Sequence, residues 1–248
     1  MSAAPDDFDA RRTSPNEVAY LRLLHLADSA LPIGALAHSF GLETLAAAGM
    51  LSVENLAEFL DGFLQESALL EAVFCREAFR RAAVPEAQFD AEALLRLNER
   101  LAAMKPGRES RAGSAALGHN LLQLVASLTD ALPVRKTLDA CRAAGAKGPV
   151  IHHSIAFGLA AGALGFDESS AVLAYLHQIA ASLVSACQRL LPLGQTRAAR
   201  ILWDMKPAIV SAAEHSAGCR PEEATSFTPV ADWGAMQHPA LATRLFIS

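Results

Sequence analysis

The polar side chains best spaced for catalysis lie near the start of the chain, where Ser39 follows His38 and Glu43 comes four residues later. One helical turn would bring the hydroxyl and the carboxylate together, as a nucleophile and its base require. Serine is also a preferred N-cap, and a carboxylate in the first turn interacts favourably with the helix dipole. We interpret the pair mainly as a cap and keep a helical enzyme that uses Ser39, Glu43 and His38 as an alternative.

A second set of residues could bind a metal ion, since imidazole and thiolate are good ligands for nickel and zinc. The set comprises His152, His153, His177, Cys75, Cys141, Cys187 and Cys219. Adjacent residues on a helix point about 100° apart, so the two neighbouring histidines are poorly placed to share one ion. The cysteines are far apart and form no CxxC pair, which favours reduced thiols in a cytosolic protein. We predict no metal site here and keep a direct nickel chaperone as the alternative.

Other catalytic signatures are missing from the sequence. A phosphate-binding loop needs glycines at fixed spacing followed by Lys and Ser or Thr, and Gly145-Ala-Lys-Gly148 has neither the spacing nor the hydroxyl. There is no GxSxG and no HExxH sequence. We therefore predict a protein that is not an enzyme and that has no catalytic residues and no cofactor.

The composition favours a helical protein with a large core. Hydrophobic residues make up 52% of the chain, charged residues 19% and aromatic residues only 6%, a balance typical of closely packed helices rich in Ala and Leu. The net charge of −5 gives no basic field for nucleic acid. No run of about 18 uninterrupted apolar residues predicts a membrane span, and the polar N-terminus is unlike a signal peptide. We expect a cytoplasmic protein whose surplus of apolar residues covers a homodimer or partner interface.

The spacing of hydrophobic residues and the positions of helix-capping and helix-breaking residues predict an all-α, single-domain bundle of about nine helices. The predicted helices cover residues 18–27, 40–48, 52–83, 90–104, 108–128, 133–144, 149–164, 168–191 and 195–215, the last range forming one or two helices divided near Pro207. Residues 1–17 have no periodicity and are expected to be flexible. The pattern is lost again in residues 219–248, which we expect to form an irregular tail that orders against a partner. The helical domain would then cover residues 18–248, tail included.

Three segments resemble the UreF family of urease accessory proteins. The first contains ALPIGALAHSFGLE (residues 30–43), which is similar to the family's opening ALPxGxFxHSxGLE. The second is LLPLGQTRAARIL (residues 190–202), and the third is MQHPALATRLFIS (residues 236–248), which is similar to the family's closing Met-x-His…Arg-Leu-Phe-x-Ser. The three occur in the family's order, and weaker similarity connects them from about residue 18 to the end of the chain.

The resemblance implies an all-α dimer that joins UreD (also called UreH) and the GTPase UreG on apo-urease. In that family the assembly inserts nickel into urease, and UreF is thought to regulate or couple GTP hydrolysis by UreG. The nickel is then handled by the complex, and we do not expect this chain to bind it stably. The missing phosphate loop agrees with a scaffold that is not itself the GTPase.

The matching positions supply the candidate partner-binding residues. His38, Ser39, Glu43, Gln195 and Thr196 are candidates for contacting UreG or lining a metal passage, and the tail residues His238, Arg244, Leu245 and Phe246 are candidates for contacting UreD. The sequence departs from the family pattern at three positions. Leu36 replaces an aromatic residue, Gln237 an arginine and Ile247 a commonly basic residue, which weakens the expected charge of the tail.

Overall fold

The computed structural model describes residues 15–145 and 148–248. It is 72% helical and has no strand in these two ranges, which confirms the predicted all-α bundle. The predicted flexible segment 1–17 lies mostly outside the described residues, and its last three residues begin the first helix. The α-helices are α1 (Pro15–Leu26), α2 (Leu42–Ala47), α3 (Leu56–Phe63), α4 (Leu69–Ala82), α5 (Ala91–Ala103), α6 (Arg108–Leu128), α7 (Leu132–Ala143), α8 (His153–Ala163), α9 (Glu168–Leu190), α10 (Gln195–Asp204), α11 (Lys206–Gly218) and α12 (Pro229–Gln237).

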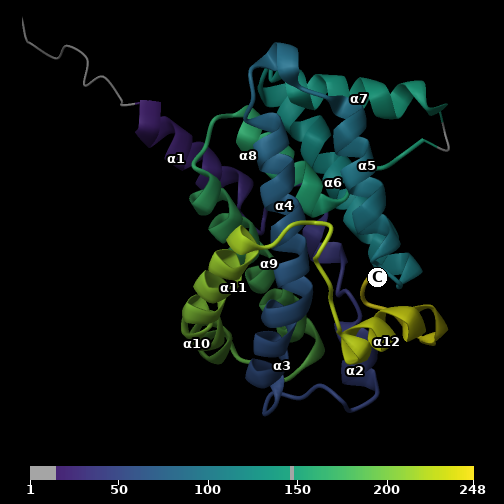
Figure 1. Ribbon diagram of the computed structural model, residues 1–248. Coiled ribbons are helices and arrows are strands. Elements are labelled where there is room, and N and C mark those ends of the chain that lie inside the picture. Colours follow the sequence, from purple (N-terminus) through teal and green to yellow (C-terminus); the bar gives the residue numbers. More distant parts are fainter. Residues whose placement is uncertain (1–14, 146–147) are drawn as a thin grey trace, which may run out of the picture.

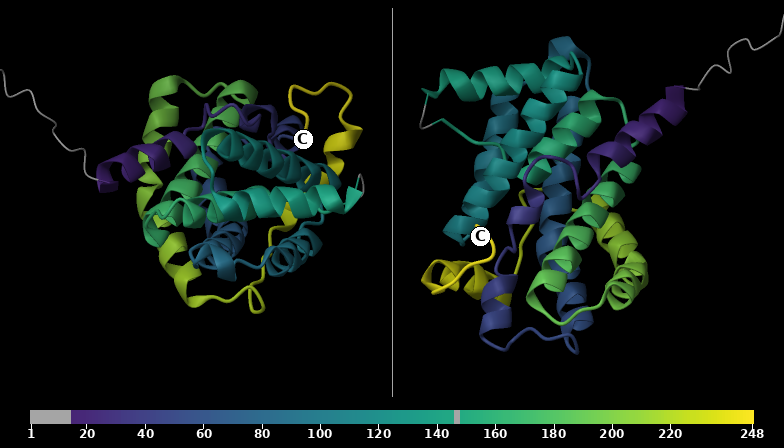
Figure 2. Two further views of the ribbon diagram at one scale, coloured as in Figure 1. Left: turned by 90° about the horizontal axis from the view of Figure 1, so that it is seen from above. Right: turned by 180° about the vertical axis from the view of Figure 1, so that it is seen from behind.

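Helix α4 runs through the centre of the bundle, with α9, α10 and α11 on one side and α5, α6 and α7 on the other (Figures 1 and 2). Its closest neighbour is α8, which is buried along almost its whole length. Two glycines of α8 make this approach possible. A Cβ atom on Gly158 would lie 2.0 Å from the carbonyl oxygen of Cys75, and one on Gly162 would lie 2.3 Å from that of Phe79. The two backbones therefore meet at a distance that only glycine allows.

Several helix boundaries follow the predicted signals. The Asp90 carboxylate caps α5 by accepting a hydrogen bond from the Ala93 amide, and Asp167 caps α9 in the same way through Ser170. Pro133 lies in the first turn of α7, as expected. Helix α8 begins at His153, four residues later than predicted. The Asn98 side chain holds the preceding backbone extended by bonding the Val150 carbonyl and the His152 amide.

The single helix predicted for residues 52–83 is interrupted. Asn55 accepts a hydrogen bond from the Ser52 amide and donates one to the Met50 carbonyl, so residues 50–55 form a turn and α3 begins only at Leu56. A π-helical turn, η2 (Leu64–Ala68), then joins α3 to α4. Such a turn shifts the direction of the following side chains without breaking the helix.

The C-terminal tail differs from the expectation of an irregular segment that needs a partner to order. It contains α12 and a short 3-10 turn, η5 (His238–Ala240), and its last residues pack against the body of the protein. His238, Phe246 and Ser248 are no more than 5% exposed. Helix periodicity is weak in this segment because it contains three prolines and only short apolar runs. Long-range contacts with the rest of the protein order the tail instead.

Helix α9 is long and apolar enough to cross a membrane by length and composition alone. However, 56% of its apolar window is buried inside the fold, which is typical of the core helix of a globular bundle. Its buried side chains include Val172, Tyr175 and Leu176, which contact the central helices. The apolar composition is therefore explained by packing.

Candidate functional site

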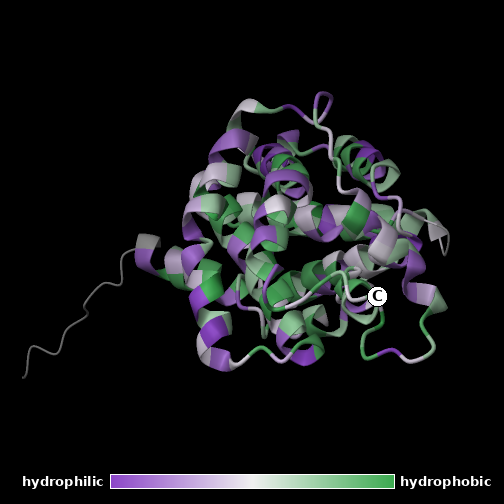
Figure 3. Cartoon of the chain, turned by 90° about the horizontal axis from the view of Figure 1, so that it is seen from below, coloured by the Kyte–Doolittle hydropathy of each residue, from purple (hydrophilic) through white to green (hydrophobic). Residues whose placement is uncertain are grey.

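The structure brings together residues that the sequence places at opposite ends of the chain. The turn before α2 and the first turn of α2 carry His38, Ser39 and Glu43, and the tail folds back onto them (Figure 1). A hydropathy view shows apolar residues along the closing loop that leads to the C-terminal end (Figure 3). Two sets of residues that were assigned to different partners thus form one cluster, which we call the tail clamp: His38, Ser39, Glu43, Glu109, His238, Arg244, Phe246 and Ser248.

The carboxylate of Glu43 is the centre of the tail clamp. One oxygen accepts a hydrogen bond from the Leu245 amide at 2.5 Å, and the other accepts bonds from His238 Nε2 at 2.9 Å and the Phe246 amide at 3.1 Å. Burial by itself would raise the pKa of Glu43, but these hydrogen bonds outweigh it and lower the pKa. The carboxylate therefore fixes the backbone of the tail at two successive residues.

His238 links the two acidic side chains of the clamp and is fully buried. Its Nδ1 lies 2.6 Å from Glu109 Oε2, while its Nε2 faces Glu43. Each ring nitrogen therefore faces one carboxylate, and the imidazole bridges Glu43 and Glu109. Arg244 adds a bond from Nη1 to Glu109 Oε1 at 3.2 Å, so one cation and one imidazole hold the tail to α6.

The turn before α2 binds the last residue. The amides of Ser39 and Phe40 donate to the Ser248 carbonyl oxygen at 2.5 and 3.2 Å, and His38 Nδ1 lies 2.7 Å from the Ser248 hydroxyl. Phe40 has a φ of 51°, which is rare for a residue with a side chain and points both amides at one acceptor. Burial lowers the pKa of His38. The strained turn therefore has a clear role as a backbone docking site for the tail.

Two further residues of the site were not singled out from the sequence. Neither Glu109 nor Arg189 was identified as a site residue from the sequence. Arg189 lies at the end of α9, bonds the Leu36 carbonyl at 2.7 Å and places its guanidinium 4.1 Å from the centre of the Phe246 ring. A charged residue that ends an otherwise apolar helix, directly before the LLPLG motif, was the available signal.

The outer side of the docked tail is apolar. Leu36, Leu245 and Ile247 are 49%, 63% and 67% exposed, and the contacts of Arg189 and of the Ala37 carbonyl bring their backbones side by side. We call these three side chains the tail face. The candidate residues therefore divide by exposure: the buried ones hold the tail, and Leu245 faces outward. Arg244 does both, because it bonds Glu109 and is still 42% exposed.

Gln195 and Thr196 are not part of this cluster. They lie exposed at the N-terminus of α10, which packs on α9 and α11 at the other side of the bundle from α12 (Figures 1 and 2). The neighbouring Arg197 donates a hydrogen bond to the Val53 carbonyl at 3.1 Å and ties this turn to the loop before α3. The side chains of the two candidates remain accessible.

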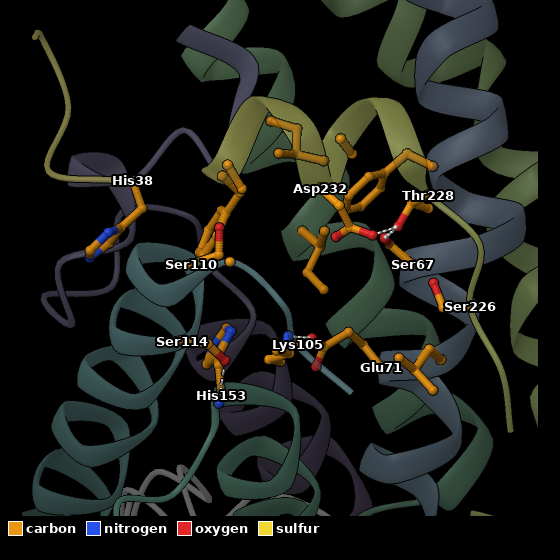
Figure 4. Close-up of a pocket in the computed structure, with 18 of the residues that line it drawn as sticks. His38, Ser67, Glu71, Lys105, Ser110, Ser114, His153, Ser226, Thr228 and Asp232 are labelled. Carbon is orange, nitrogen blue, oxygen red and sulfur yellow. Dashed lines mark hydrogen bonds and ion pairs between the residues drawn. The ribbon is translucent and has the colours of Figure 1, made fainter. Parts of the chain in front are cut away.

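A partly open cavity of about 150 Å³ lies beside the tail clamp and shares His38 with it. Figure 4 shows Lys105 and Glu71 directed at one another inside it, with Ser114 beside His153 and Asp232 near Thr228. Burial by itself would raise the pKa of Glu71, but the ion pair with Lys105 lowers it. Burial also lowers the pKa of His153 to about 4. The cavity therefore combines a largely apolar lining with a buried ion pair, and His153 is neutral at physiological pH.

The geometry does not support the two alternatives drawn from the sequence. The Ser39 hydroxyl is fully buried and accepts a hydrogen bond from the Glu43 amide at 3.4 Å, while the Glu43 carboxylate is occupied by the tail. A nucleophile needs a base and access to substrate, and Ser39 has neither. The described residues also contain no group of three or more His, Cys, Asp and Glu side chains placed to hold one metal ion.

Comparisons with known proteins agree on one family. A family model described as UreF matches residues 50–206. The chain is 33% identical to the urease accessory protein UreF of Nostoc sp. (strain PCC 7120) over 92% of its length and 96% of that protein. It is 30% identical to UreF of Rhodopseudomonas palustris (strain BisB5) over 100% and 99% of the two chains, and 33% identical to UreF of Corynebacterium glutamicum (strain R) over 91% and 96%. The similarity to these proteins thus extends well beyond the segment matched by the family model.

Proposed function

Because this chain belongs to the UreF family of urease accessory proteins, and so serves urease maturation, we propose that it is a non-catalytic scaffold that joins UreD (UreH) and the GTPase UreG on apo-urease. In this proposal it assists nickel insertion by regulating or coupling GTP hydrolysis by UreG. The protein works in the cytoplasm as a homodimer, and nickel is handled by the assembly without a resident cofactor on this chain.

The tail clamp is the observation that carries the scaffold proposal. Polar groups of the opening and closing motifs hydrogen-bond to one another and hold the tail against the body of the protein. The docked tail leaves the apolar tail face exposed on the surface. Exposed apolar side chains at fixed positions favour protein association, because a partner can bury them without first ordering them. We assign the UreD contact to Leu245 and Arg244, which face outward, and give His238 and Phe246 the supporting role.

The engagement of Glu43 changes its proposed role. Its carboxylate already accepts three hydrogen bonds, so a metal passage or a direct UreG contact would require the tail to leave. We therefore propose that Glu43, Ser39 and His38 act by positioning the tail. Gln195 and Thr196 stay candidates for the UreG contact because their side chains are exposed.

The test is co-expression of the chain with the UreD homologue of the same organism, followed by size-exclusion chromatography with light scattering. We expect a complex of two copies of each chain that recruits UreG. Leu245→Asp should abolish the complex, whereas Val210→Asp on α11, where the side chain is 43% exposed, should leave it intact. If wild-type protein stays separate from UreD, or if both variants behave alike, the proposal is wrong.

A further inference from the structure

A groove separates α3 and η2 from the segment that enters α12, and none of the tail-face residues lines it. It has a volume of about 460 Å³ and is lined by Phe59, Phe63, Glu58 and Glu66 on one wall and by Phe227 and Val230 on the other. Phe227 is 78% exposed and Val230 is 44% exposed. An aromatic side chain this exposed leaves a large apolar area in water that an occupant could cover.

The groove is held open by hydrogen bonds between its walls. The Phe227 amide donates to Glu66 Oε2 at 3.0 Å, and the Ser67 hydroxyl donates to the Thr228 hydroxyl at 3.3 Å. Thr228 in turn bonds the Asp232 carboxylate at 3.2 Å, within the first turn of α12. The two walls are therefore positioned before anything binds, which lowers the entropic cost of association.

The charge of the groove is entirely negative. Glu58 and Glu66 flank its aromatic floor, and none of the described residues that line it is Lys, Arg or His. The sequence extends this pattern, since residues 50–75 and 221–237 contain several Asp and Glu and no basic residue. An acidic rim around an apolar floor repels nucleic acid and anionic lipid and attracts a cationic segment.

We propose that this groove binds a basic amphipathic segment of a partner protein. An apolar side chain of that segment packs between Phe63 and Phe227, and Lys or Arg residues on either side of it pair with Glu58 and Glu66. An arginine would also stack on the exposed ring of Phe227. The proposal concerns a surface outside the tail clamp and the tail face, so its test does not depend on the proposed UreD contact.

The test uses the full chain and a fluorescein-labelled 14-residue peptide of leucine and lysine, with leucines at helical positions i, i+3, i+4 and i+7. A peptide with glutamate in place of every lysine, and one with serine in place of every leucine, are the peptide controls. Fluorescence anisotropy should show binding of the leucine–lysine peptide only. The affinity should fall as salt is raised, because Glu58 is exposed and Glu66 is only half-buried.

Two protein variants and their matched controls locate the binding. Glu58→Gln combined with Glu66→Gln should weaken binding about tenfold at low salt, since each exposed pair contributes several-fold. Phe227→Ser should weaken it as well. The controls are Glu92→Gln on α5, where the side chain is 87% exposed, and Leu128→Ser at the end of α6, where it is 57% exposed. Binding that the groove variants leave unchanged, or no measurable binding of the leucine–lysine peptide, would overturn the proposal.

Discussion

Replacing Glu43 with Gln tests the tail clamp directly, because the change keeps the size of the side chain and removes its charge. In the wild-type chain the carboxylate accepts from Leu245, Phe246 and His238. A glutamine has one acceptor oxygen, so its NH₂ group must face at least one of these buried donors. An unpaired buried donor costs about 1–3 kcal/mol, and charge-assisted bonds are weakened as well, so we expect a loss of about 2–4 kcal/mol.

The assay is urea unfolding of the isolated chain at pH 7, followed by circular dichroism, with a thermal melt alongside. For a chain of this length the loss should lower Tm by roughly 5–15 °C. Glu214→Gln on α11, where the side chain is exposed, is the matched control and should change the free energy of unfolding by less than about 0.5 kcal/mol. The Trp233 fluorescence of α12 reports whether the tail leaves the body.

The same experiment at lower pH checks the sign of the electrostatic argument. The pKa of Glu43 is lowered from 4.5 in the folded protein, so its contribution is present above pH 4.5 and is lost as the pH falls through the folded value. The stability difference between wild type and Glu43→Gln should therefore shrink below pH 4.5. If the variant is as stable as the control at pH 7, or if the difference grows in acid, the assigned role of Glu43 is wrong.

Three further changes probe the core, the tail and the cavity. Gly158→Ala should destabilise the protein by roughly 1–3 kcal/mol, because the new Cβ has no room against α4, whereas Gly218→Ala, with open space around it, should be nearly neutral in a thermal melt. Phe246→Ala should cost about 3–5 kcal/mol in urea unfolding if the tail belongs to the fold, and an unchanged midpoint would return the tail to a partner-dependent segment. Because the pKa of His153 is lowered from 6.5 to about 4, the folded state loses stability as the pH falls from 6.5 towards 4, by about 2 kcal/mol at pH 5 for this residue. His153→Phe should therefore show a smaller loss between pH 7 and pH 5, and equal slopes for the two proteins would refute the assignment.

Local signals predicted most of the helices because each signal involves residues close in sequence. Asp90 and Asp167 cap the helices that follow them, and the stripe of apolar residues in 168–191 is α9. One error occurs where a side chain distant in sequence intervenes. Asn98 delays the start of α8 by bonding backbone more than fifty residues away, and no local pattern encodes that contact.

The candidate site shows the same division. The motifs identified the types of residue that matter, and Ser39, Glu43, His238 and Phe246 all belong to the cluster that the structure forms. Their assignment to two separate partners was made from sequence position, and it could not show that Glu43 and His238 contact one another. Arg189 was missed because its role depends on the Phe246 ring, which approaches it only in the folded chain.

The sequence by itself determined the all-α class and the family, since helix periodicity, capping residues and three ordered motifs are local properties that survive without coordinates. Only the tertiary structure decided that the tail is part of the fold, that Glu43 holds it, and that its apolar side chains divide into buried and exposed sets. The physical reason is that burial and hydrogen-bond partners depend on contacts between residues about 200 positions apart, and these form only when the chain has folded.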